Sequence, residues 1–183
     1  MSLGLYLHIP YCFSKCRYCD FYSHPGERGV PEAYVDALLR ELSRFAPEAP
    51  LQPDTLYFGG GTPSLLRPEQ AKRLIDAARP MPGAEITLEA NPETVTEESL
   101  AGFREAGVNR ISFGVQSARD TQLRTLGRPH TAKQARAAFA AARRAGFANI
   151  SGDIMLALPH YTEAEFDETL ELIEDGGATH ISA

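Results

Sequence analysis

The chain contains three cysteines, and all of them lie within one run of eight residues, as Cys12, Cys16 and Cys19. Two disulfides would need an even number of cysteines with distant partners, so this spacing favours a shared metal centre. An iron–sulfur cube normally takes four protein ligands. Three thiolates on one loop therefore predict a [4Fe–4S] cluster whose fourth iron is open to a molecule from outside the chain.

Zinc is the alternative occupant of this segment. Cys12, Cys16 and Cys19 together with His24 would make a tetrahedral site of three cysteines and one histidine. Cysteines buried without any ligand role are the ordinary interpretation of such residues. Three thiols in so short a segment favour a ligand set over that interpretation.

A glycine-rich segment, Gly59-Gly60-Gly61-Thr62, directly follows a predicted strand. Glycines let the backbone approach a ligand closely and present its N–H groups without interference from Cβ atoms. The segment is not a Walker loop, because no Lys-Ser/Thr pair follows the glycines, and it does not match G-x-G-x-x-G. A tight turn between a strand and a helix is the ordinary alternative.

Polar side chains also follow three later strands or lie within them, as Glu89, Gln116 and Asp153. Each alone is ordinarily a solvated or capping group, but their shared placement at strand ends favours a common site. A carboxylate there can hold an ammonium group or ribose hydroxyls, and an amide can both donate and accept hydrogen bonds. Arg128 can meet a carboxylate with two hydrogen bonds, although a surface ion pair is its ordinary role.

The elements that carry these residues alternate between strand and helix patterns, which is typical of a parallel sheet built from βα units. Thr96, Thr131 and Thr162 precede helices as N-caps, and Gly107, Gly146 and Gly176 fall at helix C-termini. The predicted strands are 3–9, 55–58, 85–89, 110–115, 149–155 and 180–182. The predicted helices are 31–45, 68–78, 97–105, 132–145 and 163–174.

Two topologies fit this pattern, a doubly wound open sheet and a complete or partial (β/α) barrel. Distinctive polar or glycine-rich segments at nearly every strand end favour the barrel, whose active face collects residues from many strands. We expect residues 1–183 to form one α/β domain. The sequence stops inside the predicted sixth strand, so we expect an incomplete domain from a longer protein.

Composition excludes several classes of function. A formal net charge of −6 and a pI near 5.4 argue against nucleic-acid binding, because such proteins usually carry a basic patch. The apolar runs are too short to span a bilayer, and no charged leader precedes an apolar segment. Cysteines confined to one metal-binding motif fit a reducing compartment, so we expect a cytoplasmic protein.

The ordered motifs resemble the radical S-adenosylmethionine (SAM) superfamily. C-x3-C-x2-C with Tyr18 before the third cysteine is similar to its cluster motif. The run from Tyr6 to Cys12, followed by GGGTPSLL, EANPET, GVNRISFGVQS, LGRPHT and GDIM, resembles the oxygen-independent coproporphyrinogen III oxidase family. The resemblance implies a three-quarter (β/α)6 barrel of parallel strands, truncated here in the sixth, in which SAM binds the open iron.

The resemblance also implies roles for individual residues. Tyr6 and Tyr18 would flank the cluster and SAM, and Gly60, Gly61 and Thr62 would contact the methionine part of SAM. The other implied SAM-binding residues are Glu89, Gln116, Arg128 and Asp153. In active members the reduced cluster cleaves SAM to a radical that abstracts hydrogen from the substrate. The segment 157–162 departs from the family pattern, which leaves His160 either a surface residue or an added ligand.

Within this family the chain resembles the HemW-type heme chaperones more than the oxidases. The discriminating residues are Asp20 and Phe21, where the oxidases show a Gly-Cys pair after the third cluster cysteine. The resemblance implies heme binding, an electron donor for the cluster and an acceptor protein for heme, without decarboxylase activity. The alternative is an enzyme, the coproporphyrinogen III oxidase itself, with a porphyrinogen as its substrate.

Overall fold

In the computed structural model, residues 2–45, 52–158 and 160–183 are described. Their largest unit is a sheet of six parallel strands, ordered β1-β4-β5-β6-β7-β8. These strands are β1 (Gly4–Ile9), β4 (Thr55–Gly60), β5 (Glu85–Ala90), β6 (Arg110–Gln116), β7 (Asn149–Ile154) and β8 (His180–Ser182). A parallel α/β fold, as the sequence predicts, is therefore confirmed.

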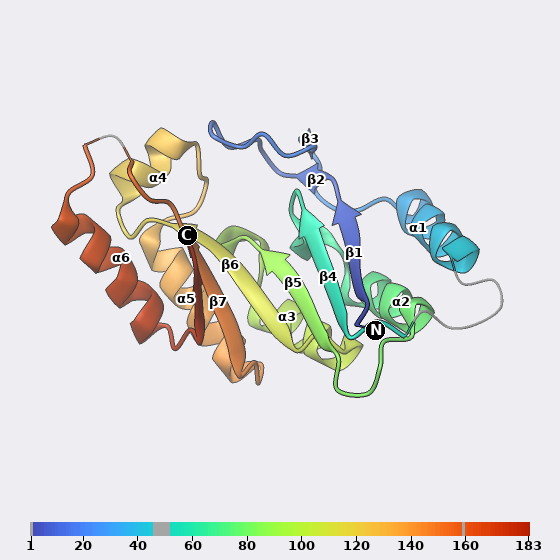
Figure 1. The fold of residues 1–183 in the computed structure, drawn as a ribbon. Coiled ribbons are helices and arrows are strands. Elements are labelled where there is room, and N and C mark those ends of the chain that lie inside the picture. Colours follow the sequence, from blue (N-terminus) through green and yellow to red (C-terminus); the bar gives the residue numbers. More distant parts are fainter. Residues whose placement is uncertain (1, 46–51, 159) are drawn as a thin grey trace.

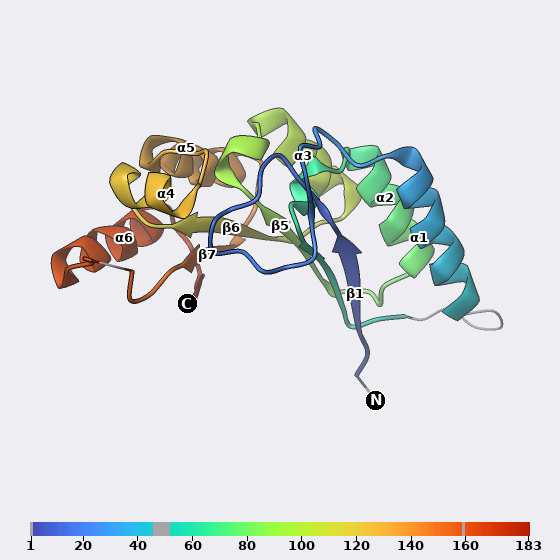
Figure 2. The same ribbon diagram turned by 90° about the horizontal axis from the view of Figure 1, so that it is seen from above.

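Helices connect the strands and cover one face of the sheet (Figures 1 and 2). They are α1 (Glu32–Phe45), α2 (Pro68–Ala78), α3 (Glu97–Ala106), α4 (Asp120–Leu126), α5 (Ala132–Arg144) and α6 (Glu163–Asp175), with short 3-10 turns at Pro63–Leu65 and Pro92–Thr94. Two short strands, β2 (Tyr11–Cys12) and β3 (His24–Pro25), pair with each other apart from the main sheet. In the described part of the chain β1 and β8 are the two edges, so the sheet is an open arc of a barrel.

Strand alternation separates the two faces of this arc. Leu56 and Phe58 of β4, like Ile111 and Phe113 of β6, are buried toward the helices, and Phe113 meets Phe139 of α5 at 5.2 Å between ring centroids. The residues between them on each strand point to the opposite, concave face. Those residues are mostly polar, so the concave face is lined by hydrogen-bonding groups instead of the packed apolar layers of a closed barrel.

Local signals explain most element boundaries. Thr96, Thr131 and Thr162 each accept a hydrogen bond from the backbone N–H three residues later, as predicted for N-caps. At the end of α6 the left-handed residue is Gly177 (φ 74°), whereas the predicted Gly176 remains helical (φ −61°). The sequence also missed helix α4, whose seven residues are too few for a clear apolar period.

None of the helices in the described ranges is both long enough and apolar enough to cross a membrane.

Candidate functional site

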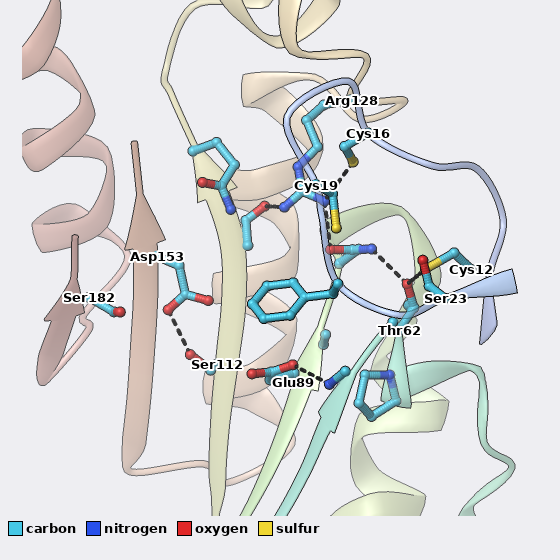
Figure 3. Close-up of a pocket in the computed structure, with 18 of the residues that line it drawn as sticks. Cys12, Cys16, Cys19, Ser23, Thr62, Glu89, Ser112, Arg128, Asp153 and Ser182 are labelled. Carbon is cyan, nitrogen blue, oxygen red and sulfur yellow. Dashed lines mark hydrogen bonds between the residues drawn. The ribbon is translucent and has the colours of Figure 1, made fainter. Parts of the chain in front are cut away.

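A cavity of about 540 Å³ lies on the concave face, between the strands and the loop that carries the cysteines. Parallel strands bring their carboxyl ends to one edge of a sheet, so residues from β4, β5, β6 and β7 meet here. Figure 3 shows the three cysteines on one side of the cavity, with Glu89 and Asp153 on strands facing them. The cavity lining includes Cys12, Cys16, Cys19, Tyr18, Gly60, Gly61, Thr62, Glu89, Gln116, Arg128 and Asp153.

The cysteine loop, residues 10–27, lies over the strand ends (Figure 2). Backbone hydrogen bonds close its base, from His24 N–H to the Pro10 carbonyl (2.6 Å) and from Glu27 N–H to the Cys12 carbonyl (3.1 Å). Its far side is tied to the end of α4, because Arg17 N–H donates to the Leu126 carbonyl at 2.9 Å. These bonds hold the three thiols at the cavity although the loop has little regular structure.

The donor chemistry of this loop fits a four-iron cluster better than a single ion. All three cysteines are free thiols and line the same cavity. No three His, Cys, Asp or Glu side chains of the described residues gather closely enough to hold one metal ion. A cube takes one thiolate per iron, so its ligands stand farther apart than those around a single zinc.

His24 does not join the thiols. Its ring packs against Tyr22, with centroids 5.3 Å apart, and against Tyr11 at 6.3 Å. The alternative zinc site, with His24 as its fourth ligand, is therefore not assembled in the described structure.

The glycine segment shows why glycine is needed at two positions. Gly60 has φ 117°, a conformation that side chains rarely adopt, and a Cβ there would lie 2.6 Å from the His8 ring. At Gly61 a Cβ would lie 2.8 Å from the Tyr11 carbonyl oxygen and 3.0 Å from the sulfur of Cys12. Thr62 donates its hydroxyl to the same sulfur at 3.5 Å. This segment therefore packs directly against the first cysteine.

Two hydrogen-bond donors, one of them in the glycine segment, hold the Glu89 carboxylate. The Tyr57 hydroxyl donates to one carboxylate oxygen at 2.8 Å, and Gly60 N–H donates to the other at 3.2 Å. Burial raises the pKa of Glu89 above its ordinary value, while these two hydrogen bonds oppose that rise. The carboxylate is thus fixed in position and faces the cavity (Figure 3).

Asp153 is the second carboxylate of the cavity. The Ser112 hydroxyl donates to it across the β6–β7 pair at 2.9 Å. Burial is the largest influence on its pKa, which is raised, while the hydrogen bond from Ser112 and the positive charge of Arg110 oppose the rise. The negative charge of Asp153 in turn helps to raise the pKa of Glu89, so the two carboxylates share one electrostatic environment.

Arg128 connects the cysteine loop to the strands. Its guanidinium donates to the Asn91 side-chain oxygen at 3.0 Å and to the Gly114 carbonyl at 2.8 Å, and lies 3.6 Å from the sulfur of Cys16. Burial raises the pKa of the Cys16 thiol, and the charge of Arg128 opposes that rise. The buried Nε of Arg128 has no hydrogen-bond partner among the described residues, and the residue lines the cavity.

Gln116 lies at an irregularity in β6. The register with β7 shifts between Gly114 and Gln116, and Gln116 has φ 69° although it is not glycine. A bulge of this kind redirects a side chain, and backbone strain is tolerated mainly where the surroundings require it. The buried Gln116 side chain is thereby placed in the cavity lining.

Two residues from the sequence predictions lie elsewhere. Tyr6 is outside the described cavity lining and 53% exposed, where it stacks on Tyr57 and contacts His8 through its hydroxyl at 3.1 Å. His160 is exposed, has φ 60° and is also outside that lining. Its neighbour Pro159, part of the same divergent loop, lies outside the described residues.

Several residues of the cavity were not predicted as site residues. Asn91 accepts from Arg128 and donates to Thr62 at 3.1 Å, and so joins two predicted groups. Further unpredicted residues of the lining lie on the strands, among them Tyr57, Arg110, Ser112, Ser151 and His180. The period of two along a strand, counted back from Asp153, could have found Ser151; the other four lie on strands β4, β6 and β8, where no predicted carboxylate starts such a count.

Comparison of the sequence with known proteins identifies relatives of this chain. A sequence model described as the Radical SAM superfamily matches residues 6–173. The heme chaperone HemW of Haemophilus influenzae is 39% identical over 183 residues, which cover 94% of this chain and 48% of that protein. HemW of Escherichia coli is 43% identical over 163 residues, 86% of this chain and 43% of the relative. The chain therefore spans about half the length of these curated relatives.

Solved structures show the same fold. The coproporphyrinogen III oxidase HemN of Escherichia coli, described as a radical SAM enzyme, matches with a TM-score of 0.86 and 29% identity. That match covers all of this chain and 44% of HemN. The hydrogenase maturase HydG matches with a TM-score of 0.68 over 99% of this chain, at 14% identity, which shows a shared fold alone.

Proposed function

Because the chain belongs to the radical SAM superfamily, which implies a [4Fe–4S] cluster and SAM, we propose that it binds both in this cavity and serves in a heme chaperone. The observation that carries the proposal is the convergence of three free thiols with a fixed carboxylate and a guanidinium on one cavity. The heme chaperones among its relatives, about 40% identical, favour heme as the bound cargo.

Different residues of the chain would bind the cluster and SAM. Cys12, Cys16 and Cys19 would hold the cluster, and the open iron would take the amino and carboxylate groups of SAM. Arg128 would neutralise the SAM carboxylate through the positive charge of its guanidinium at the cavity. When bound, the cluster supplies the electron that cleaves SAM.

The remaining lining residues would position the rest of the cofactor. Glu89 and Asp153 present negative charge to the sulfonium and to the ribose hydroxyls, and Gln116 offers both a donor and an acceptor. Gly60, Gly61 and Thr62 form the wall beside the first cysteine and let the methionine part approach the backbone. Tyr18 lines the same end of the cavity and would shield the cluster from water.

A second function, oxidative decarboxylation of coproporphyrinogen III, is favoured by the match to HemN over the whole chain. The residues after Cys19 argue against it. They are Asp20 and Phe21, where the oxidases show a Gly-Cys pair. Phe21 is 69% exposed and lines the cavity, where its apolar ring would contact a planar ligand such as heme. The chaperone is therefore the function we propose, with an electron donor and a heme-accepting protein as its partners.

The experiment is anaerobic reconstitution of the chain with iron and sulfide, followed by three measurements. We expect a brown protein whose spectrum changes on adding SAM, stable binding in a heme titration, and no carboxylate loss from coproporphyrinogen III. Turnover of coproporphyrinogen III without stable heme binding would contradict the chaperone function and support the oxidase function. A colourless protein that retains zinc would contradict both. Cys16→Ala is the matched control, because it removes one ligand from the same loop.

A further inference from the structure

The concave face continues beyond the residues assigned to SAM. Arg110 and Ser112 of β6, Ser151 of β7 and His180 of β8 all line the same cavity. The strand registers place them side by side, since Ser112 is opposite Ser151 and Ser151 is opposite His180. Asp153 borders this set, and Figure 3 shows its carboxylate directed toward Ser112. The cavity therefore has a second polar wall with no assigned ligand.

Arg110 is the charged member of this wall. Its side chain is half-buried, and its hydrogen bond goes to the Thr87 hydroxyl at 3.4 Å, a long contact to a neutral group. Among the described residues no carboxylate lies within ion-pair distance of its guanidinium. A guanidinium withdrawn from water is normally paired with an anion. Arg110 thus offers its charge to the cavity.

Ser151 supplies an independent observation. Its side chain is fully buried, and its hydroxyl has no hydrogen-bond partner among the described residues. It lies on the inward register of β7, flanked on the neighbouring strands by Ser112 and His180. Buried hydroxyls are nearly always hydrogen-bonded, so an orphan in a residue of the cavity lining indicates a missing acceptor.

We propose that Arg110, Ser151 and His180 form a subsite for a carboxylate group of a second ligand that shares the cavity with SAM. A guanidinium matches a carboxylate with two parallel hydrogen bonds, and the buried Ser151 hydroxyl in the same lining is a donor with no competing partner among the described residues. The nearby Asp153 and Glu89 disfavour a doubly charged phosphate here, since like charges repel strongly in a partly dehydrated site. This subsite rests on the proposed function, in which the second ligand is a tetrapyrrole, a molecule that carries propionate carboxylates.

The test compares two probes on the reconstituted chain. Coproporphyrin III carries four carboxylates, and its tetraamide has nearly the same shape without charge. Both are titrated by fluorescence under anaerobic conditions, with SAM present. We expect the wild-type chain to bind the acid at least about 10-fold more tightly than the amide.

Substitutions localise that preference. Arg110→Gln should lower the affinity for the acid by about 10-fold or more and leave the affinity for the amide unchanged, because only a charge-assisted hydrogen bond is lost. Arg110→Lys should restore part of the preference, and Ser151→Ala should reduce it by a smaller factor. The matched control is Arg136→Gln on α5, where the arginine is exposed and its nearest carboxylate is Asp175, at 3.6 Å.

Equal affinity of the wild-type chain for acid and amide would overturn the subsite, as would an unchanged acid affinity in Arg110→Gln. Loss of the SAM-induced spectral change in Arg110→Gln would also overturn it, because Arg110 would then belong to the SAM site. Retention of that change, with normal iron content, is the expected result. If the wild-type chain showed no spectral response to SAM, the proposed function would fail while the acid-over-amide preference still tested the subsite.

Discussion

Replacing Gly61 by alanine tests whether the glycine segment positions the first cysteine. An added Cβ would lie 2.8 Å from the Tyr11 carbonyl oxygen, 2.9 Å from its nitrogen and 3.0 Å from the Cys12 sulfur. Two of these atoms belong to the backbone of β2 and cannot rotate away. To reach an ordinary 3.4 Å contact, the Tyr11 oxygen must move by about 0.6 Å.

The expected cost follows from overpacking a site of this kind, about 1–3 kcal/mol of folding free energy. For a chain of this length that lowers Tm by about 2–12 °C. The same displacement moves Cys12 away from its place beside Thr62, so we also expect less iron after reconstitution. A change confined to stability would not separate packing from ligand placement, so iron and sulfide content are measured with the melting curve.

Gly29→Ala is the matched control. A Cβ there would meet only the Leu65 carbonyl at 3.9 Å, and Gly29 is not in the left-handed conformation. It should leave iron content unchanged and Tm equal or slightly higher, because alanine reduces the freedom of the unfolded chain. If Gly61→Ala matched Gly29→Ala in both Tm and iron content, the close approach at Gly61 would have no role in stability or in placing Cys12.

Three further predictions address the cysteine loop and the carboxylates. Cys16→Ala should abolish the cluster, seen as loss of the anaerobic visible absorption; normal iron content would remove Cys16 from the ligand set. Arg128→Ala should retain iron and lower the affinity for SAM by about 10-fold or more in a spectral titration, since a charge-assisted contact is lost. An unchanged affinity would exclude Arg128 from the SAM site. Burial raises the pKa values of Glu89 and Asp153. As the pH is lowered, these carboxylates should therefore become protonated, and SAM affinity should fall, at a higher pH than the ordinary pKa of a carboxyl group would give. Tyr57→Phe removes a hydrogen bond that lowers the pKa of Glu89, so the midpoint of that decline should move to higher pH; an unmoved midpoint would show that this bond does not control Glu89.

The fold was largely predictable because its signals are local. Apolar strands, threonine N-caps and terminal glycines are read from neighbouring residues, and they located the six strands of the main sheet and five of the helices. Helix α4 was missed because seven residues span barely two turns, and its Leu123 and Leu126 are buried by contacts made elsewhere in the chain. Short elements depend on tertiary packing, which no local pattern reports.

The three thiols, their spacing and the order of the polar strand ends can be read without a structure, because they depend only on residue type and position. Tertiary structure alone decided which of these groups meet. It brings Arg128 to Cys16 across 112 positions and holds Glu89 with Tyr57, and it places Tyr6 and His24 outside the described cavity lining. Among the described residues it also leaves Arg110 with a neutral partner only, the Thr87 hydroxyl, and the Ser151 hydroxyl with no hydrogen bond. Whether a polar group is hydrogen-bonded depends on neighbours that folding brings close, so no sequence pattern marks the hydrogen-bonding state of these two residues.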